Sequence, residues 1–217
     1  MNPPFSTEQF FDVFKLYNLT IWPFQILLFI SGLLLIYLTI KRTSLSDKII
    51  PSTLAFYWLW MGIVYHLLFF TSINKAAYIF GILYIIQGFL IIYFGIVKKK
   101  LSFEFQPTMK GYLGALAILY ALIIYPLLGY SFGHVYPASP TFGLPCPTTI
   151  FTLGMFMWVK NKFPLVLLVI PFTWSVIGFS AVFSFGVIED TGLIVTGIIS
   201  LVVILLHNKR ASVLVDK

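Results

Sequence analysis

The stretch Gly133–Trp158, "GHVYPASPTFGLPCPTTIFTLGMFMW", decides the fold, because it places breakable backbone and a short helix between long apolar runs. Its first half is rich in proline and glycine, and the helical pattern that follows, Pro147–Val159, has only thirteen residues. At a rise of about 1.5 Å per residue, this helix is too short to cross a hydrocarbon layer of about 30 Å. Either the segment enters and leaves by the same face, or the lead-in completes the crossing as non-helical chain.

Composition indicates that lipid surrounds this chain. Of its 217 residues, 59% are hydrophobic and 10% are charged, whereas a soluble domain carries about 25% charged residues. The net charge of +7 comes from basic residues clustered between apolar runs, which is typical of membrane topology and not of a nucleic-acid partner. One cysteine excludes an internal disulfide, and the N-terminal residues lack the basic start of a signal peptide.

Six further segments are apolar and have roughly the twenty residues that a transmembrane helix needs. They are Leu19–Ile40, Thr53–Ile73, Ala77–Val97, Gly111–Tyr130, Pro164–Phe185 and Val187–His207. Together with the short helix of the opening stretch, they predict an all-α membrane protein. We expect a seven-transmembrane-helix bundle with a short, broken fifth span.

The basic residues favour a fifth segment that crosses. With seven crossings and the N-terminus outside, twelve of the fourteen Lys and Arg residues fall on the cytoplasmic side. These are Lys41, Arg42, Lys48, Lys98, Lys99, Lys100, Lys110, Lys160, Lys162, Lys209, Arg210 and Lys217. Only Lys15 and Lys75 remain outside, whereas a fifth segment that does not cross gives seven on each side. Since basic residues in short loops set orientation, we predict an outer N-terminus and a cytoplasmic C-terminus.

The sequence divides into one membrane domain with short flanks. Residues 1–18 are expected to form an outer interfacial amphipathic helix, because Ser6 and Gln9 fit a capping box and Phe10, Phe14 and Tyr17 share one face. Residues 19–207 form the seven-helix transmembrane domain, and residues 208–217 form a cytoplasmic tail.

Cys146 is the first candidate for a binding or reactive residue. Pro147 suits the first helical position, which predicts Cys146 at the N-cap, beside the positive end of the helix dipole. Such a position favours an anion or a reactive thiolate, and the simpler, preferred interpretation is a small buried cysteine at a turn. Thr148 and Thr149 follow, and they could cap the helix or contact a ligand.

Three further titratable groups stand near the predicted outer side. His66 lies inside the second apolar segment, where an ionisable side chain is a functional-site hypothesis by default; the alternative is a neutral histidine bonded to a tyrosine or a carbonyl. Glu189 and Asp190 open the last segment, where the helix dipole alone would explain them, or where they could bind a cation or carry protons. His207, at the inner side, is expected to cap the carbonyls of its own helix.

These residues predict a ligand-binding site that opens outward. Its members are His66, His134, Cys146, Thr148, Thr149, Glu189 and Asp190. We expect no metal and no cofactor, because the chain has no CxxC, HxxxH or HxxE spacing and no glycine-rich phosphate loop.

Four stretches resemble one family. "PFSTEQFFDVFKLYNLTIWPFQ" from Pro4, "YHLLFFTSINKAAYIFG" from Tyr65, "YPLLGYSFGHVYPASPTFGLPCPTTIFTLG" from Tyr125 and "IEDTGL" from Ile188 resemble the bacterial domain of unknown function 6064 family. Its members are small integral membrane proteins that automatic naming sometimes labels permeases. The matching positions are His66, Asn74, His134, Pro137, Pro140, Thr141, Gly143, Pro145, Cys146, Pro147, Thr148, Thr149, Glu189 and Asp190. Many members have proline where this chain has Lys75. The resemblance implies a multi-pass protein of the bacterial cytoplasmic (inner) membrane, and it implies no reaction.

Three functions fit these observations. The first is a permease, or a permease-like binder of a small solute, with an outward-facing polar pocket. The second is a membrane-embedded enzyme or a thiol-dependent redox protein that acts at the outer face, and the third is a non-catalytic sensor or assembly partner. Beyond the lipid bilayer and a small solute, the sequence predicts no partner and no oligomeric state.

Overall fold

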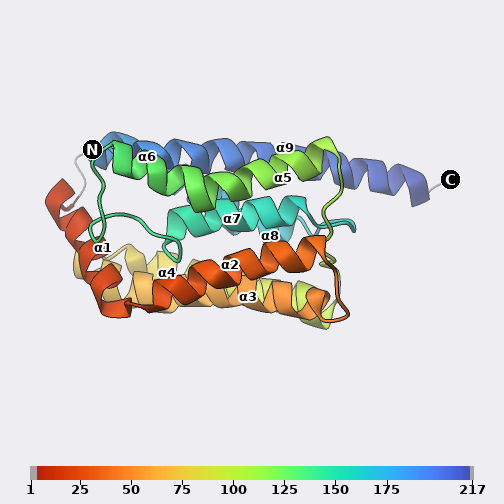
Figure 1. Cartoon of the computed structure of the whole chain (residues 1–217), viewed down its shortest axis with the longest axis horizontal. Helices are drawn as coiled ribbons and strands as arrows, with labels where there is room; N and C mark the ends of the chain where they lie inside the picture. The colour runs from red at the N-terminus through yellow and green to blue at the C-terminus, as the bar shows by residue number, and fades with distance from the viewer. Residues whose placement is uncertain (1–3, 216–217) are drawn as a thin grey trace.

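The computed structural model describes residues 4–215, with side chains through Ala211, and shows an elongated bundle of roughly antiparallel helices (Figure 1). The α-helices are α1 (Thr7–Ile21), α2 (Phe24–Ile40), α3 (Ser46–Trp60), α4 (Ala77–Ile92), α5 (Met109–Leu119), α6 (Tyr125–Ser131), α7 (Pro145–Met157), α8 (Val166–Phe185) and α9 (Thr191–Val215). The π-helical segments η1 (Met61–Phe69), η3 (Tyr93–Val97) and η4 (Tyr120–Ile124) extend α3, α4 and α5, and the 3-10 turns are η2 (Phe70–Ser72) and η5 (Ile188–Asp190). Regular structure across residues 4–215 is therefore helical, apart from two isolated β-bridges.

Five helical segments within the described residues are long and apolar enough to cross a membrane. They are Ser46–Ser72, Ala77–Val97, Met109–Ser131, Val166–Phe185 and Ile188–Ala211. The pair α1 and α2 makes a sixth if it counts as one span, but the two helices meet at an angle of 86°. The predicted first span, Leu19–Ile40, is thus broken at Trp22 and Pro23 and resumes as a straight helix at Phe24. Pro23 has no N–H to donate and its ring crowds the preceding turn, so the helix cannot continue through it.

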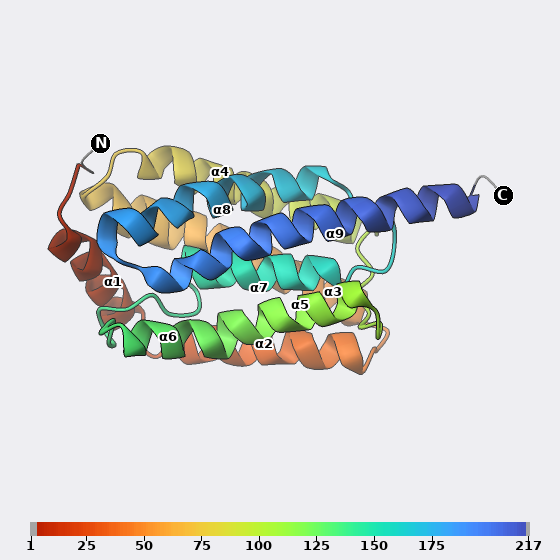
Figure 2. The same cartoon turned by 90° about the horizontal axis from the view of Figure 1, so that it is seen from above.

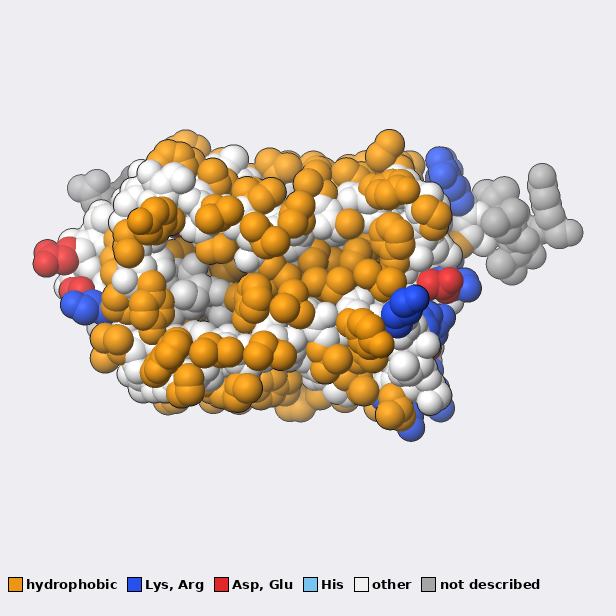
Figure 3. Space-filling model, viewed as in Figure 1, with side chains coloured by type: hydrophobic (Ala, Val, Ile, Leu, Met, Phe, Trp, Pro, Cys, Tyr) orange, Lys and Arg blue, Asp and Glu red, His pale blue; other side chains and the backbone are white. Residues whose placement is uncertain are grey.

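Lysine and arginine side chains gather at one end of the bundle, which we call the basic end (Figure 3). Here the loop after η3 pairs with the loop after α7: Glu104 N donates to the Trp158 carbonyl at 2.9 Å, and Lys160 N donates to the Ser102 carbonyl at 2.8 Å. The Lys160 ammonium lies 2.9 Å from a Glu104 carboxylate oxygen, and this hydrogen bond holds the pKa of Glu104 below its usual value. The loops of the basic end are therefore tied to one another.

Helix α1 lies across the opposite end of the bundle, which we call the α1 end (Figures 1 and 2). Among the described basic residues, only Lys15 and Lys75 belong to this end, because the other eleven lie in loops or helix termini at the basic end. Lys217, which completes the predicted set of twelve, lies outside the described residues. The last helix also runs through most of the predicted tail, 208–217, and ends at Val215.

Helix α7 lies in the middle of the bundle and has protein on every side. Its thirteen residues are buried throughout except for Cys146, and it packs against α5, α8 and α9. Two glycines bring α5 and α7 together, since a Cβ on Gly154 would lie 2.9 Å from the Gly114 carbonyl oxygen. Because its side chains meet other side chains and not lipid, the length of α7 need not match the thickness of a hydrocarbon layer.

The irregular lead-in to α7 has its backbone groups paired by side chains of α1. Asn18 donates from one amide nitrogen to the carbonyls of Pro137 and Ser139, at 2.7 and 2.8 Å, and Tyr17 donates to the carbonyl of Gly143 at 3.1 Å. Both side chains are fully buried. Non-helical backbone is tolerated away from water only where it is paired in this way.

The apolar face of α1 packs on protein. The predicted capping box is confirmed: Gln9 N donates to Ser6 Oγ, and Ser6 N donates to Gln9 Oε1. Phe10 and Phe14 are buried, and Phe10 stacks on Phe185 of α8 with a centroid distance of 4.3 Å. Phe10 and Phe14, which the sequence analysis placed on the apolar face of an interfacial helix, therefore pack against protein and cover the α1 end of the bundle.

Candidate functional site

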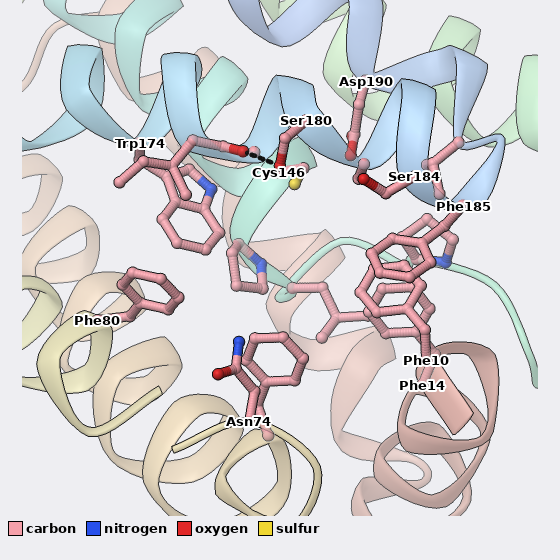
Figure 4. Close-up of a pocket in the computed structure, with 18 of the residues that line it drawn as sticks. Phe10, Phe14, Asn74, Phe80, Cys146, Trp174, Ser180, Ser184, Phe185 and Asp190 are labelled. Carbon is pink, nitrogen blue, oxygen red and sulfur yellow. Dashed lines mark hydrogen bonds between the residues drawn. The ribbon is translucent and has the colours of Figure 1, made fainter. Parts of the chain in front are cut away.

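A cavity of about 240 Å³ lies at the α1 end, beneath α1 and between η1, the start of α4 and the second half of α8 (Figure 4). Its walls are rich in aromatic side chains, which include Phe10, Tyr65, Phe80, Trp174 and Phe185. Small-molecule pockets usually measure about 300–1,000 Å³, with apolar walls and a few convergent polar groups. The volume of this cavity lies just below that range, so the cavity suits a small ligand.

Asp190 provides the carboxylate of the cavity. The 3-10 turn η5 places it there, with Asp190 N donating to the Val187 carbonyl at 3.0 Å. Its Oδ1 accepts a hydrogen bond of 2.6 Å from the hydroxyl of Tyr125, on α6, and its side chain also bonds the thiol of Cys146. Asp190 is 1% exposed, so two neutral donors hold a carboxylate that water hardly reaches.

Cys146 enters the cavity from the start of α7. It is partly exposed, while the residues that flank it on α7 are buried, and the cavity accounts for this exposure. The thiol faces a carboxylate, whereas activated cysteines lie beside cationic side chains. The geometry therefore makes Cys146 a hydrogen-bond donor to Asp190.

Trp174 and Gly178, one turn apart on α8, shape the wall beside the thiol. Trp174 Nε1 is buried and has no nitrogen or oxygen partner among the described residues. A Cβ on Gly178 would lie 3.4 Å from that nitrogen and 3.5 Å from the Cys146 sulfur. The absence of a side chain at Gly178 thus leaves open the space where the indole N–H and the thiol meet.

The start of α7 differs from the predicted one. The helix begins at Pro145 with Leu144 as its N-cap, so Cys146 is the second helical residue and not the cap. Residues in the first turn of a helix leave their N–H groups unpaired, so a proline there loses no hydrogen bond. Pro145 meets this condition as well as Pro147 does, and the helix begins at Pro145, two residues before the predicted start. The predicted N-cap at Cys146 is therefore wrong.

The two threonines that follow are engaged in structural hydrogen bonds. Thr148 Oγ1 accepts from Gly143 N at 2.9 Å and thereby fixes the turn into α7. Thr149 Oγ1 lies 3.3 Å from the hydroxyl of Tyr84, on α4. Both threonines are fully buried, and neither belongs to the cavity lining.

His134 and Glu189 form a second polar pair at the α1 end. His134 Nδ1 lies 2.9 Å from Glu189 Oε1, and the imidazole stacks on Phe11 of α1 with a centroid distance of 4.7 Å. Glu189 is buried, and no described residue bonds its other carboxylate oxygen. The pair connects the lead-in, α1 and η5 beside the cavity, but neither side chain lines it.

His66 sits behind the cavity wall in an aromatic enclosure. Its ring contacts those of Phe70, Phe80, Tyr84 and Trp174 at centroid distances of 4.7–6.1 Å. It is fully buried, and neither ring nitrogen has a hydrogen-bond partner among the described residues. The tyrosine or carbonyl bond that the sequence left open as an alternative is therefore not formed.

His207 binds carbonyls of another segment. Its Nε2 lies 3.1 Å from the Lys160 carbonyl oxygen and 3.3 Å from that of Asn161, both in the loop between α7 and α8. Because α9 continues to Val215, the carbonyls of its own helix are already paired near residue 207, and the predicted cap is wrong.

The structure thus brings Cys146 and Asp190 into the cavity, and places His66, His134 and Glu189 around it. No group of three His, Cys, Asp or Glu side chains within the described residues could hold a metal ion. Sequence reasoning did not name Trp174 or Tyr125 as site residues, although both line the cavity. A signal existed for Trp174 only: Gly178 follows it at the i+4 spacing that places both on one helix face.

These features define a class: a small, all-helical protein whose apolar flanks are compatible with a membrane, with an aromatic-walled cavity at one end. Within that class, the chain belongs to the family of unknown function DUF6064, whose model matches residues 7–214, as the resemblance predicted. No curated protein and no solved structure matches the chain.

Proposed function

We propose that this protein crosses the bacterial cytoplasmic membrane seven times and binds a small solute in the cavity at the α1 end, which faces outward. Large apolar side chains are exposed along the flanks of the bundle, as contact with lipid requires (Figure 3). The concentration of Lys and Arg at the basic end supports a cytoplasmic position for that end.

The cavity with its Asp190, Tyr125 and Cys146 group is the observation that carries this proposal. It combines apolar walls with a small set of polar atoms that converge on one side, which is the usual composition of a small-molecule site. A void with no ligand to hold would cost stability, because its lining loses packing contacts.

Binding is the first step of the proposed function, and any transport would be a second. Midway along the bundle the interior is filled by large side chains, among them Trp58, Tyr84 and Phe151, each at most 1% exposed. Passage of a solute to the basic end therefore requires helices to move. A permease-like binder fits this arrangement better than an open pore.

The test fills the cavity without changing the fold. Ala181, on α8, lines the cavity, so Ala181→Leu places a larger side chain in it. Val176→Leu is the matched control, because Val176 is exposed on the same helix. Each protein is purified from native membranes and denatured, and the released small molecules are quantified per mole by mass spectrometry.

We expect one compound in near-equimolar amount in the wild type and in Val176→Leu, and at least a tenfold loss of it in Ala181→Leu. Equal amounts of every compound in all three proteins would show that the cavity holds no solute, and the proposal would then be withdrawn.

A further inference from the structure

Among the described residues, no side chain supplies a counter-charge to the carboxylate of Asp190. Its hydrogen-bond partners, the Tyr125 hydroxyl and the Cys146 thiol, are neutral donors. The ion pairs among the described residues connect Arg42, Lys160 and His134 to other acids, and none involves Asp190. A buried carboxylate loses its hydration, so a ligand that supplies a positive charge stabilises its ionised form.

The neighbouring acid, Glu189, does not provide the positive charge that Asp190 lacks. Glu189 adds a second buried carboxylate next along the chain, and its own partner is His134. The His134 ring is used by that contact and by its stack on Phe11, and it does not line the cavity. No described lysine or arginine lines the cavity either, so nothing there would repel a cation.

The aromatic side chains that line the cavity suit the same kind of ligand. Tyr65 and Phe70 stack at a centroid distance of 5.6 Å, and Phe80 meets Trp174 edge-on at 5.4 Å. All four rings line the cavity, and Phe80 and Trp174 are labelled in Figure 4. Aromatic faces attract a cation within about 6 Å, and they also accept an apolar body.

We infer that the cavity binds a small organic cation: an ammonium group held against the Asp190 carboxylate, on an apolar body enclosed by the aromatic walls. This inference rests on the proposed function, and it specifies the chemistry of the solute. An anion would be repelled by the Asp190 carboxylate, and a neutral solute would leave the charge of Asp190 uncompensated.

The experiment compares ammonium compounds with alcohols of matched shape. Phenylethylammonium is paired with 2-phenylethanol, and cyclohexylammonium with cyclohexanol, and the binding of each to the full-length protein in detergent is measured by calorimetry at pH 7. We expect at least one ammonium compound to bind the wild type at least tenfold more tightly than its alcohol. This comparison needs no variant, so it holds even if a substitution fails to fold.

Two variants then test the residue. Asp190→Asn keeps an oxygen that can accept from Tyr125 but removes the charge, and it is expected to abolish the tenfold preference. Asp12→Asn removes an exposed acid of α1 outside the cavity, and it is expected to keep the preference.

The outcomes separate this inference from the proposed function. Alcohols that bind as tightly as the ammonium compounds, or a preference that survives in Asp190→Asn, would overturn the cation and leave a cavity for neutral solutes. If no compound binds, the cation is also overturned, and the amounts released from the Ala181→Leu protein decide separately whether the cavity holds any solute.

Discussion

Gly143 is the residue at which the irregular lead-in turns into α7. Its φ of +102° belongs to a region that side chains rarely adopt, and a Cβ there would lie 2.5 Å from Leu28 Cδ1. Its carbonyl accepts from Tyr17, and its N–H donates to Thr148. The turn is therefore specified by backbone freedom, by space and by two hydrogen bonds at one position.

We predict that Gly143→Ala lowers the stability of the protein by more than the roughly 1–3 kcal/mol that backbone strain alone costs, because the new methyl group also displaces Leu28. Gly133→Ala is the control, since Gly133 has a φ of +87° but no atom within 4 Å of its Cβ position. Thermal unfolding in detergent measures both. Equal losses in the two variants would mean that contact with Leu28 adds nothing.

At this scale the sequence predicts local features well and distant contacts poorly. The Ser6 and Gln9 capping box follows from a spacing of three residues, and it is present. The contact between Cys146 and Asp190 joins positions 44 residues apart, and no periodicity relates the two. Cys146 and Asp190 could be named as candidates, but not as neighbours.

At the scale of elements, α1 is the roof of the cavity. Phe10 and Phe14 line it from above, and Phe5, just before the helix, stacks on Phe185 at a centroid distance of 5.1 Å. The 86° bend between α1 and α2 allows the helix to lie across the end of the bundle. Helix α1 therefore covers one side of the cavity.

We predict that Phe10→Ala increases the rate at which a small thiol reagent modifies Cys146, the only cysteine, by several-fold, because the substitution removes part of the roof. Leu16→Ala is the matched control on the same helix, since Leu16 is 58% exposed and lines no part of the cavity. Rates are measured well below the unfolding temperature, because loss of a buried phenylalanine also costs about 3–5 kcal/mol. Unchanged labelling of Phe10→Ala would show that the reagent enters by another route.

The amphipathic pattern predicted helix α1 but not its surroundings. Phenylalanines at helical spacing indicate that one face of the helix is buried away from water. Contact with lipid and contact with protein both fulfil that requirement. The choice depends on whether the bundle offers a complementary surface, and Phe70 and Phe185, which provide it, lie far along the chain. The same limit applies to α7, whose length was readable while its enclosure by other helices was not.

For the whole molecule, the proposed topology makes a direct prediction about accessibility. In a Cys146→Ser background, single cysteines replace Lys75 at the α1 end and Lys99 or Lys160 at the basic end. We expect a membrane-impermeant maleimide to label Lys75→Cys on intact cells, and the other two only after permeabilisation. Labelling of Lys160→Cys together with Lys75→Cys, but not of Lys99→Cys, would place α7 on one side of the membrane and refute seven crossings.

Hydropathy predicted the positions of several long helices of the bundle. Segment Ala77–Val97 has the bounds read from sequence, and Met109–Ser131 and Val166–Phe185 differ from the predicted bounds by one or two residues. The arrangement of the helices around α7 was not predictable, because apolar segments of similar composition do not indicate which of them pack together. The contact between Gly154 of α7 and Gly114 of α5 is visible only in the structure.

During synthesis, α7 leaves the ribosome before two of the helices that enclose it, α8 and α9. Under the proposed topology, its thirteen residues, with polar groups such as Thr148, Thr149 and Thr152, form a shorter and more polar segment than the roughly 20 apolar residues that the insertion machinery selects. Its burial against α8 and α9 is complete only once those two helices are in place, so the assembly of α7 depends on chain that is synthesised after it.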